Sequence, residues 1–214
     1  MAYSDFTLAK VKQDLGIEVL EGRQLFTSVQ PVMMSDLLRQ LLDRDGGLAT
    51  LINTEKARSE FLIAPILADV RQQSNHQVSL FSGSSFNVDA EKGLIGFCDF
   101  ILSQSPEQID VTAPVVTIVE AKNESVIGGL GQCIASMVGA QIFNQRSGIV
   151  REAIYGAVTS GTNWRFLKLV GSRVWIDDRE YFLNEVDRIL GILMSAFLPP
   201  SLGTLNRLGA TGIR

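Results

Sequence analysis

Two apolar segments of the sequence carry charged residues that could hold a divalent cation. Asp99 interrupts the run Gly96-Phe97-Cys98-Asp99-Phe100-Ile101-Leu102, and Glu120 and Lys122 close the run Thr117-Ile118-Val119-Glu120-Ala121-Lys122. A carboxylate among apolar neighbours must be paired, protonated or bound to a cation. If both runs are strands and the strands are neighbours, Asp99 and Glu120 can offer oxygen ligands to Mg²⁺.

The spacing within each run predicts where these side chains point. Residues two apart on a strand share a face, so Glu120 and Lys122 should leave on one side with Ala121 on the other, and Asp99 should share its face with Phe97 and Ile101. Lys122 beside a metal could orient or deprotonate an attacking water, or neutralise charge in the transition state. An ordinary salt bridge between Glu120 and Lys122 at a strand end is the alternative reading of the same spacing.

The combined motifs resemble those of the PD-(D/E)xK, or restriction-endonuclease-like, nuclease superfamily. Gly96-Phe97-Cys98-Asp99 is similar to its Gly-x-x-Asp form, and Glu120-Ala121-Lys122 is similar to its (Asp/Glu)-x-Lys motif. Gln132 stands where some branches carry a glutamine early in the next helix. Cys98 replaces the proline of the family's name, and Ser136 replaces the tyrosine of the recombination-type exonucleases. The resemblance covers roughly residues 54 to 170.

This resemblance implies a fold, a site and a ligand. The fold would be α/β, with an αβββαβ core, a central mixed sheet flanked by helices and an N-terminal helical extension. The catalytic set would be Asp99, Glu120, Lys122, Gln132 and Glu60. Mg²⁺ or Mn²⁺ would be held by Asp99, Glu120, the backbone carbonyl of Ala121 and Glu60. The substrate would be nucleic acid, with DNA expected, and a homodimer is suggested by the resemblance alone. A module that keeps the fold but binds nucleic acid or a protein without cutting is the alternative.

The elements that must position these residues follow from hydrophobic periodicity. A helix is expected from about residue 53 to 73, kinked at Pro65 and carrying Glu60 on a face directed at the sheet. A surface position for Glu60 is the alternative. Strands are expected at 78–81, 94–102, 115–121, 153–159, 164–170 and 174–176, a helix at 129–144 between the third and fourth, and a closing helix at 181–197. Two short capped helices are expected earlier, after Ser4 and after Ser35.

The length and composition favour one folded domain with extensions. Of 214 residues, 46% are hydrophobic and 20% charged, which is typical of a globular chain. We expect an N-terminal helical extension at 1–50, a nuclease-like core at 51–198 and a loose C-terminal tail at 199–214. The net charge of −4 means that any contact with a polyanion must come from a local basic patch.

Several classes of protein are disfavoured. His76 is the one histidine, so a metal site built from several histidines is excluded, and a histidine-based catalytic triad is disfavoured. Cys98 and Cys133 lie in apolar segments and are expected to be buried thiols. The start of the chain lacks the basic and apolar regions of a signal peptide, and the longest apolar stretch, 189–198, is about half of the roughly 20 residues that a membrane helix needs. We expect a cytoplasmic protein that does not enter a membrane.

Overall fold

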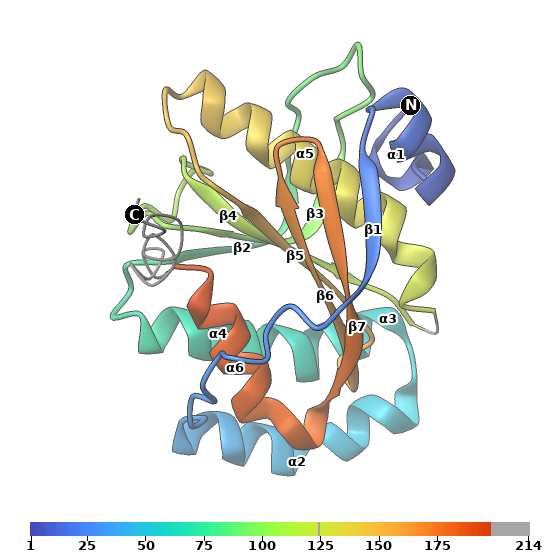
Figure 1. Ribbon diagram of the computed structural model, residues 1–214. Coiled ribbons are helices and arrows are strands. Elements are labelled where there is room, and N and C mark those ends of the chain that lie inside the picture. The colour runs from blue at the N-terminus through green and yellow to red at the C-terminus, as the bar shows by residue number, and fades with distance from the viewer. Residues whose placement is uncertain (124, 198–214) are drawn as a thin grey trace, which may run out of the picture.

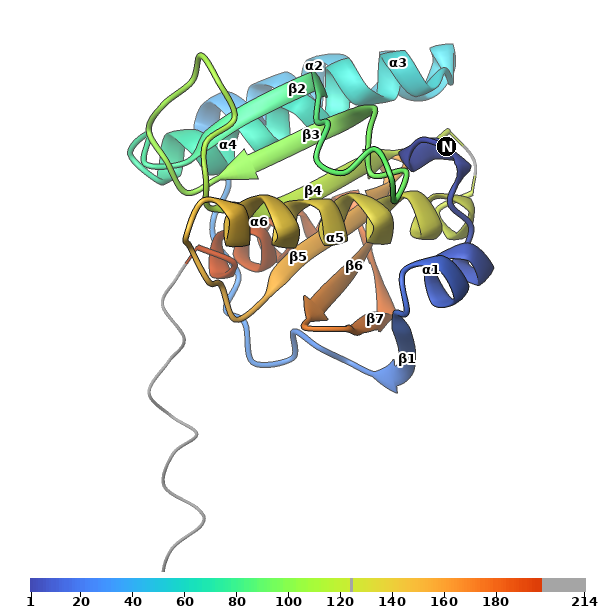
Figure 2. The same ribbon diagram turned by 90° about the horizontal axis from the view of Figure 1, so that it is seen from above.

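A seven-stranded mixed sheet forms the centre of the protein, and helices cover both of its faces (Figures 1 and 2). The computed structural model describes residues 1–123 and 125–197. The expected α/β class is therefore confirmed. The strands lie in the order β1-β7-β6-β5-β4-β3-β2. They are β1 (Glu18–Arg23), β2 (Ser79–Ser85), β3 (Phe97–Ser103), β4 (Val115–Ala121), β5 (Ile154–Thr159), β6 (Asn163–Val170) and β7 (Arg173–Phe182).

The helices divide between the two faces of the sheet. Helices α1 and α5 lie on one face, whereas α2, α3, α4 and α6 lie on the other (Figure 1). Their bounds are α1 (Leu8–Asp14), α2 (Asp36–Ile52), α3 (Glu55–Arg58), α4 (Ala64–Gln73), α5 (Leu130–Arg146) and α6 (Val186–Ser195). Short 3₁₀ turns are η1 (Tyr3–Asp5), η3 (Ile127–Gly129) and η4 (Leu183–Glu185), and η2 (Ser59–Ile63) is a π-helical turn.

Most strands that follow one another in the chain are antiparallel neighbours in the sheet. Strands β2, β3 and β4 form an antiparallel meander, and α5 then carries the chain to β5, which lies parallel to β4. Strand β6 is antiparallel to both of its neighbours, β5 and β7, and β1 pairs parallel to β7 at the edge of the sheet. A parallel pair needs a long crossover, which α5 supplies. The charged motifs thus lie on β3 and at the end of β4, toward the side of the sheet whose edge strand is β2.

Two hydrophobic cores fill the spaces between the sheet and the helices. The core beneath α5 contains Ile101, Ile118 and Ile134, and the core beneath α4 and α6 contains Phe100, Val119 and other residues. Strands β3 and β4 contribute buried residues to both cores, so they must be largely apolar on both faces. Cys98 and Cys133 are free and buried, as expected from the sequence.

Helix starts are set by hydroxyl caps and one proline. Thr7, Ser35 and Thr54 each accept a hydrogen bond from a backbone N–H of the turn that follows. The expected cap at Ser4 is wrong, because α1 begins after Thr7. The expected disruption around Pro65 takes the form of the π-helical turn η2, which lies directly before it. Proline has no N–H to donate to the carbonyl four residues earlier, so the helix register changes there.

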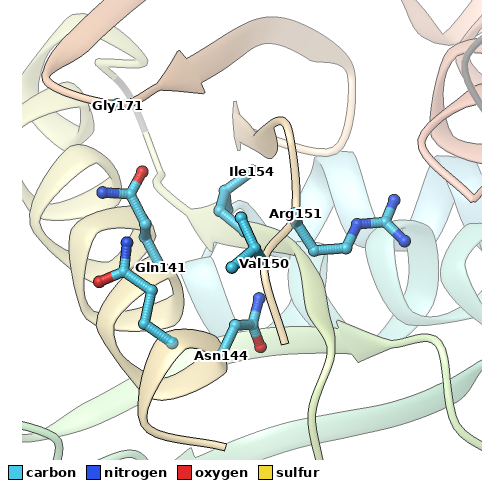
Figure 3. Close-up of a pocket in the computed structure, with 7 residues that line it drawn as sticks. Gln141, Asn144, Val150, Arg151, Ile154 and Gly171 are labelled. Carbon is cyan, nitrogen blue, oxygen red and sulfur yellow. The ribbon is translucent and has the colours of Figure 1, made fainter. Parts of the chain in front are cut away.

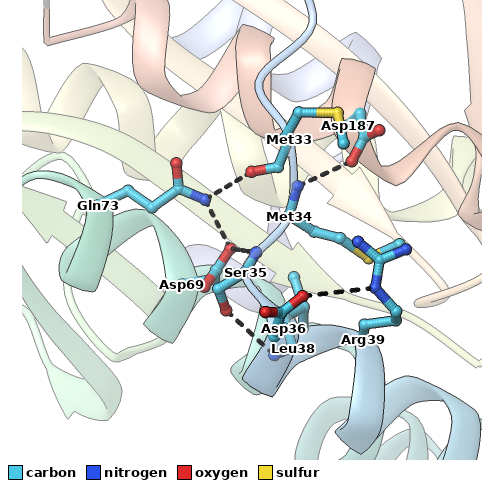
Figure 4. A network of polar contacts seen from close by, with 9 residues as sticks. All are labelled: Met33, Met34, Ser35, Asp36, Leu38, Arg39, Asp69, Gln73 and Asp187. Carbon is cyan, nitrogen blue, oxygen red and sulfur yellow. Dashed lines mark hydrogen bonds and ion pairs between the residues drawn. The ribbon is translucent and has the colours of Figure 1, made fainter.

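The first 50 residues are not wholly helical, contrary to expectation. Strand β1 lies among them and extends the sheet, and α2 runs on to Ile52 rather than ending near residue 42. The segment between these two elements is fixed to the body of the protein by acidic side chains (Figure 4). Asp187 accepts the Met34 N–H at 2.9 Å, and Asp69 accepts the Ser35 N–H at 3.2 Å. This region is therefore integrated with the sheet and its helices.

The C-terminal part also differs in its boundaries. Strand β7 continues to Phe182, which pairs with Asn163, and α6 begins only at Val186. The expected helix from residue 181 is thus shorter, because the ladder with β6 holds its first residues in the sheet. The expected tail at 199–214 lies outside the described residues. Among the helices that the structure describes, none is both long and apolar enough to cross a bilayer.

Candidate functional site

The charged motifs meet where β3 and β4 end their ladder. Phe100 pairs with Val119, and beyond this pair the Ala121 N–H donates to the Asp99 Oδ2 at 2.8 Å rather than to a backbone carbonyl. In this antiparallel register the next position joins Asp99 with Glu120. The two carboxyl groups that the sequence singled out therefore lie on adjacent strands, at a point where a side chain replaces the strand hydrogen bonds.

The pleat of β3 is interrupted at Asp99. Cys98 and Ile101 both pack in the core beneath α5, although residues three apart on a regular strand face opposite sides. Gly83 stands opposite Asp99 on β2 and has a left-handed φ of 59°. The alternation expected across Phe97, Asp99 and Ile101 therefore does not hold. Its interruption lets the Asp99 carboxylate lean toward β4.

Glu120 is a buried acid held by α5. Its side chain is 0% exposed, on the face of β4 that packs against α5. Gln132 Nε2 donates to its Oε2 at 2.7 Å, and the Ser136 hydroxyl donates to its Oε1 at 3.4 Å. Gln132 and Ser136 are one helical turn apart, so they face the same strand. Helix α5 thus fixes the orientation of this carboxyl group.

The surroundings of Glu120 disfavour its negative charge. Burial raises its pKa well above the usual range for glutamate, and the charge of Asp99 raises it further. The positive charge of Lys122 and the hydrogen bond from Ser136 both lower the pKa of Glu120. A hydrogen bond with the Asp99 carboxyl raises it. Two carboxyl groups in contact in a dry site cannot easily both be ionised. A cation between them would remove this conflict.

Lys122 is joined to Glu120 through Gln132. Its Nζ donates to Gln132 Oε1 at 3.1 Å, while the amide nitrogen of the same glutamine binds Glu120. Between the residues described, no direct ion pair links the two charges. The stem of Lys122 lies against Gly129, where an added Cβ would stand 3.0 Å from its Cγ. The glycine-rich entry to α5 therefore makes room for this side chain.

Glu60 lies near the site but is bound elsewhere. It lines a pocket of about 240 Å³ together with Asp99, Ala121 and Ser82, on the side where α3 lies. Its carboxylate is 2.7 Å from the Lys56 ammonium, and its side chain is 52% exposed. The expectation that it faces the sheet from an apolar surface is therefore only partly met. Asp99 is the residue shared by this pocket and the Glu120 centre.

Within residues 1–123 and 125–197, no group of three or more His, Cys, Asp or Glu side chains could hold a metal ion. The structure brings Asp99, Glu120, Lys122 and Gln132 together, but not Glu60. The backbone carbonyl of Ala121 belongs to the same strand end, between Glu120 and Lys122.

Some residues of the site were not singled out from the sequence. Ser136 was noted as a departure from a family pattern, and its place four residues after Gln132 was the available sign that it shares that helix face. Lys56 stands four residues before Glu60, at the spacing of a helical ion pair. The exposed Ser82 of β2 offered no such sign, because only the fold brings it to the pocket.

A second pocket lies at the opposite end of α5 (Figure 3). It has a volume of about 220 Å³ and is lined by Gln141, Gln145, Arg151 and other residues. Asn144 borders it, but its side-chain amide is occupied by the backbone of Val115, at 2.7 Å for both bonds. Its lining includes no carboxylate, so the acidic centre at β3 and β4 is the stronger candidate for metal chemistry.

Comparison with known proteins adds no relative to this picture. The chain matches no protein-family model and no curated protein.

Proposed function

We propose that the protein is a Mg²⁺- or Mn²⁺-dependent nuclease of the PD-(D/E)xK type that hydrolyses phosphodiester bonds of DNA. The observation that carries the proposal is the meeting of two carboxyl groups, Asp99 and Glu120, at one strand end, with Lys122 joined to Glu120 through Gln132. An ordinary surface ion pair would not need a buried acid held by two side chains of a helix. The arrangement instead resembles a preorganised ligand set.

The order of elements supports the same proposal. The superfamily core has a helix, three strands, a helix and a further strand. Here α3 and α4 precede the antiparallel meander of β2, β3 and β4, and α5 and the parallel strand β5 follow. Asp99 lies on the second of these strands and Glu120 with Lys122 at the end of the third, as the resemblance requires.

The residues present fit a small divalent cation. Mg²⁺ prefers oxygen ligands and commonly takes only one or two protein carboxylates, with water and phosphate as the rest. Asp99 and Glu120 supply two carboxylates, and the Ala121 carbonyl a third oxygen. The raised pKa of Glu120 means that its charged form lacks compensation in the protein alone, which a cation would supply. A group of three acids is not needed for this ion.

Each residue then has a distinct task. A bound cation would supply an activated water and stabilise charge on the phosphate. Asp99 and Glu120 would hold it, and Gln132 would fix both Glu120 and the Lys122 ammonium. Lys122 would orient the attacking water and neutralise charge on the phosphate oxygens. Glu60 would assist only after leaving Lys56, which needs little energy, because an exposed helical pair contributes only about 0.3–0.5 kcal/mol.

A binding module that does not cut is the second candidate. The pocket next to Asp99 is lined by the acids Glu55, Glu60 and Asp99 but by one base, Lys56. Without a bound cation this surface would repel a phosphate backbone. The net charge of −4 acts in the same direction. This candidate keeps the fold, lacks hydrolysis and binds nucleic acid or a protein, and the acidic surface favours a protein.

The proposal is tested by cleavage of single-stranded, duplex and branched DNA with Mg²⁺, with Mn²⁺ or with EDTA. We expect cleavage that needs the metal and falls at least about 100-fold in Glu120→Gln and Lys122→Met, since both residues act in the transition state. Glu152→Gln, an acid outside the site, is the matched control and should retain full activity.

The outcomes separate the candidates. Equal cleavage by the wild type and both site variants would mean a contaminating nuclease and would refute the assignment. Metal-independent DNA binding without any cleavage would establish the binding module instead. Metal binding is followed separately by calorimetry, where an unchanged affinity in Asp99→Asn would refute the ligand set.

A further inference from the structure

An exposed aromatic ring stands two residues before Asp99. Phe97 is 68% exposed, although it opens a strand whose other residues are largely buried. Neighbouring residues of a strand point to opposite faces, and Cys98 packs beneath α5. Phe97 therefore projects from the other face, the one on which α3 and the pocket at Asp99 lie. A phenylalanine exposed to this extent beside a candidate active site is available for a ligand.

The strand beside Phe97 is the outer edge of the sheet. The Gln108 side chain covers that edge at Leu80, accepting its N–H at 3.2 Å and donating to its carbonyl at 2.6 Å. Farther along, Ser82 and Gly83 are exposed, and nothing lies within 4 Å of a Cβ added to Gly83. The edge is thus covered by a side chain at one end and open where it borders the pocket.

The open edge offers uncharged donors, and the pocket offers one cation. Ser82 lines the pocket, and Lys56 is the only basic residue of a lining that also holds the acids Glu55, Glu60 and Asp99. Lys56 is paired with Glu60, so a phosphate is held here only together with the cation proposed at Asp99. Such a surface can position one or two phosphates but cannot neutralise a long duplex backbone. Affinity must then come from another source, and base stacking on an aromatic ring is the contact that does not depend on sequence or charge.

We propose that the substrate is single-stranded at the point of attack, with an unpaired base stacked on Phe97 and the adjoining phosphate at Ser82 and Lys56. In an intact duplex the faces of the bases are covered by their neighbours, so this ring would have no base to contact. The inference rests on the proposed function for its polynucleotide ligand. It narrows that ligand to strands with an unpaired end, gap or flap.

The test measures binding rather than cleavage. A fluorescein-labelled 12-nucleotide single strand and its blunt duplex are titrated with the full chain in Ca²⁺, with the integrity of the DNA checked by electrophoresis. We expect Phe97→Ala to weaken single-strand binding by roughly five- to 100-fold, since stacking on one ring is worth about 1–3 kcal/mol. Phe97→Leu should lose as much, because it keeps apolar area without a flat ring, whereas Phe97→Trp should retain the affinity.

Controls exclude a general effect. Val150→Ala removes an apolar side chain that is 87% exposed beside the other pocket, and it should change the affinity less than twofold. Duplex affinity should also change less than twofold in all variants. No effect of Phe97→Ala, an equal loss on the duplex, or a wild type that does not bind the single strand would each overturn the inference.

The result is separable from that of the cleavage assay. Metal-dependent cleavage that is indifferent to Phe97 would overturn this inference and leave the nuclease intact. Binding that depends on Phe97 without cleavage would refute hydrolysis and leave the single-strand site.

Discussion

Replacement of Glu120 by glutamine should remove the pH dependence that this residue imposes on stability. Because the pKa of Glu120 is raised in the folded state, chiefly by burial and then by Asp99, the folded protein holds a proton that the unfolded chain releases above about pH 4.5. The folded state is then favoured most below that pH. Its stability falls as the pH rises, until the pH passes the raised pKa.

The size of this pH effect on the free energy of unfolding follows from the linkage between proton binding and folding. Within that window each pH unit lowers the free energy of unfolding by up to about 1.4 kcal/mol, so the wild type should lose up to about 3 kcal/mol between pH 5 and 7. Glu120→Gln resembles the protonated acid in shape and cannot ionise. Its stability should therefore lack this decline and exceed that of the wild type increasingly as the pH rises.

Urea unfolding in EDTA at pH 5, 6 and 7 measures the difference. Adding Mg²⁺ should restore much of the wild-type stability at pH 7, because a bound cation favours the charged carboxylate, and should leave Glu120→Gln unchanged. Parallel stability curves for the two proteins, or equal stabilisation of both by Mg²⁺, would refute the reasoning about this site.

A control with the opposite sign is available in Glu180. Hydrogen bonds from Asn163 and Arg165 lower the pKa of Glu180, so its contribution is present above the ordinary glutamate pKa and is lost as the pH falls. Glu180→Gln should be less stable than the wild type at neutral pH, by under about 1 kcal/mol for a partly exposed pair, and equal to it in acid. The same trend in both variants would mean that the pH effect does not come from the groups named.

Two glycine substitutions, each paired with a control glycine substitution, test the backbone that shapes the site. Gly83→Ala should lower the free energy of unfolding by about 1 kcal/mol through its positive φ alone, since its surroundings are open, whereas Gly47→Ala, inside α2 and equally open, should raise it by about 0.5–1 kcal/mol; a gain in both, measured by urea unfolding, would contradict the conformational account. Gly131→Ala should cost about 1–3 kcal/mol, because its Cβ would stand 2.4 Å from the Phe6 carbonyl oxygen, whereas Gly128→Ala meets only ordinary contacts. Thermal unfolding of the Gly131 and Gly128 variants measures the difference. Equal melting temperatures would show that the segment around Phe6 moves aside without loss of stability.

The heart of the site could be predicted because its spacing is local. Glu120 and Lys122 are separated by one residue, so strand geometry alone places them on one face. Gln132 was expected from the family resemblance, and it lies in the first turn of the next helix. The contact of Asp99 with this group needed only one further assumption, that consecutive apolar strands are neighbours. That assumption is the commonest outcome for short connections.

Features fixed by distant partners escaped prediction. Strand β1 reads Glu-Val-Leu-Glu-Gly-Arg, a weak strand pattern that becomes a strand because β7 offers it an edge. The helix after Ser35 was expected to be short, but α2 continues through Gly46 and Gly47 to Ile52. Glycine opposes a helix, and the buried Ala49 holds these last turns in place. Such choices are made by packing between segments far apart in the sequence.

The position of Glu60 shows how one irregular turn changes which residues of a helix face the core. A regular helix would have carried it inward with the apolar residues around it. The π-helical turn over Ser59–Ile63 holds an additional residue, which shifts the phase of the helix. Leu62 and Ile63 are buried, and Glu60 is left at the surface with Lys56. No hydrophobic pattern predicts the place of this turn.

The parallel pairing of β1 with β7 bears on how the protein is made. It joins Glu18 with Arg173, so β1 cannot pair until the much later strand β7 has been synthesised. Strands β2 to β5, which carry the charged centre, can assemble earlier, while β1 stays unpaired until β7 has been made. Long-range pairings of this kind are slow to form and leave strand edges open to other chains. The nascent chain should therefore be most prone to aggregation, and most dependent on chaperones, in the interval before β1 docks.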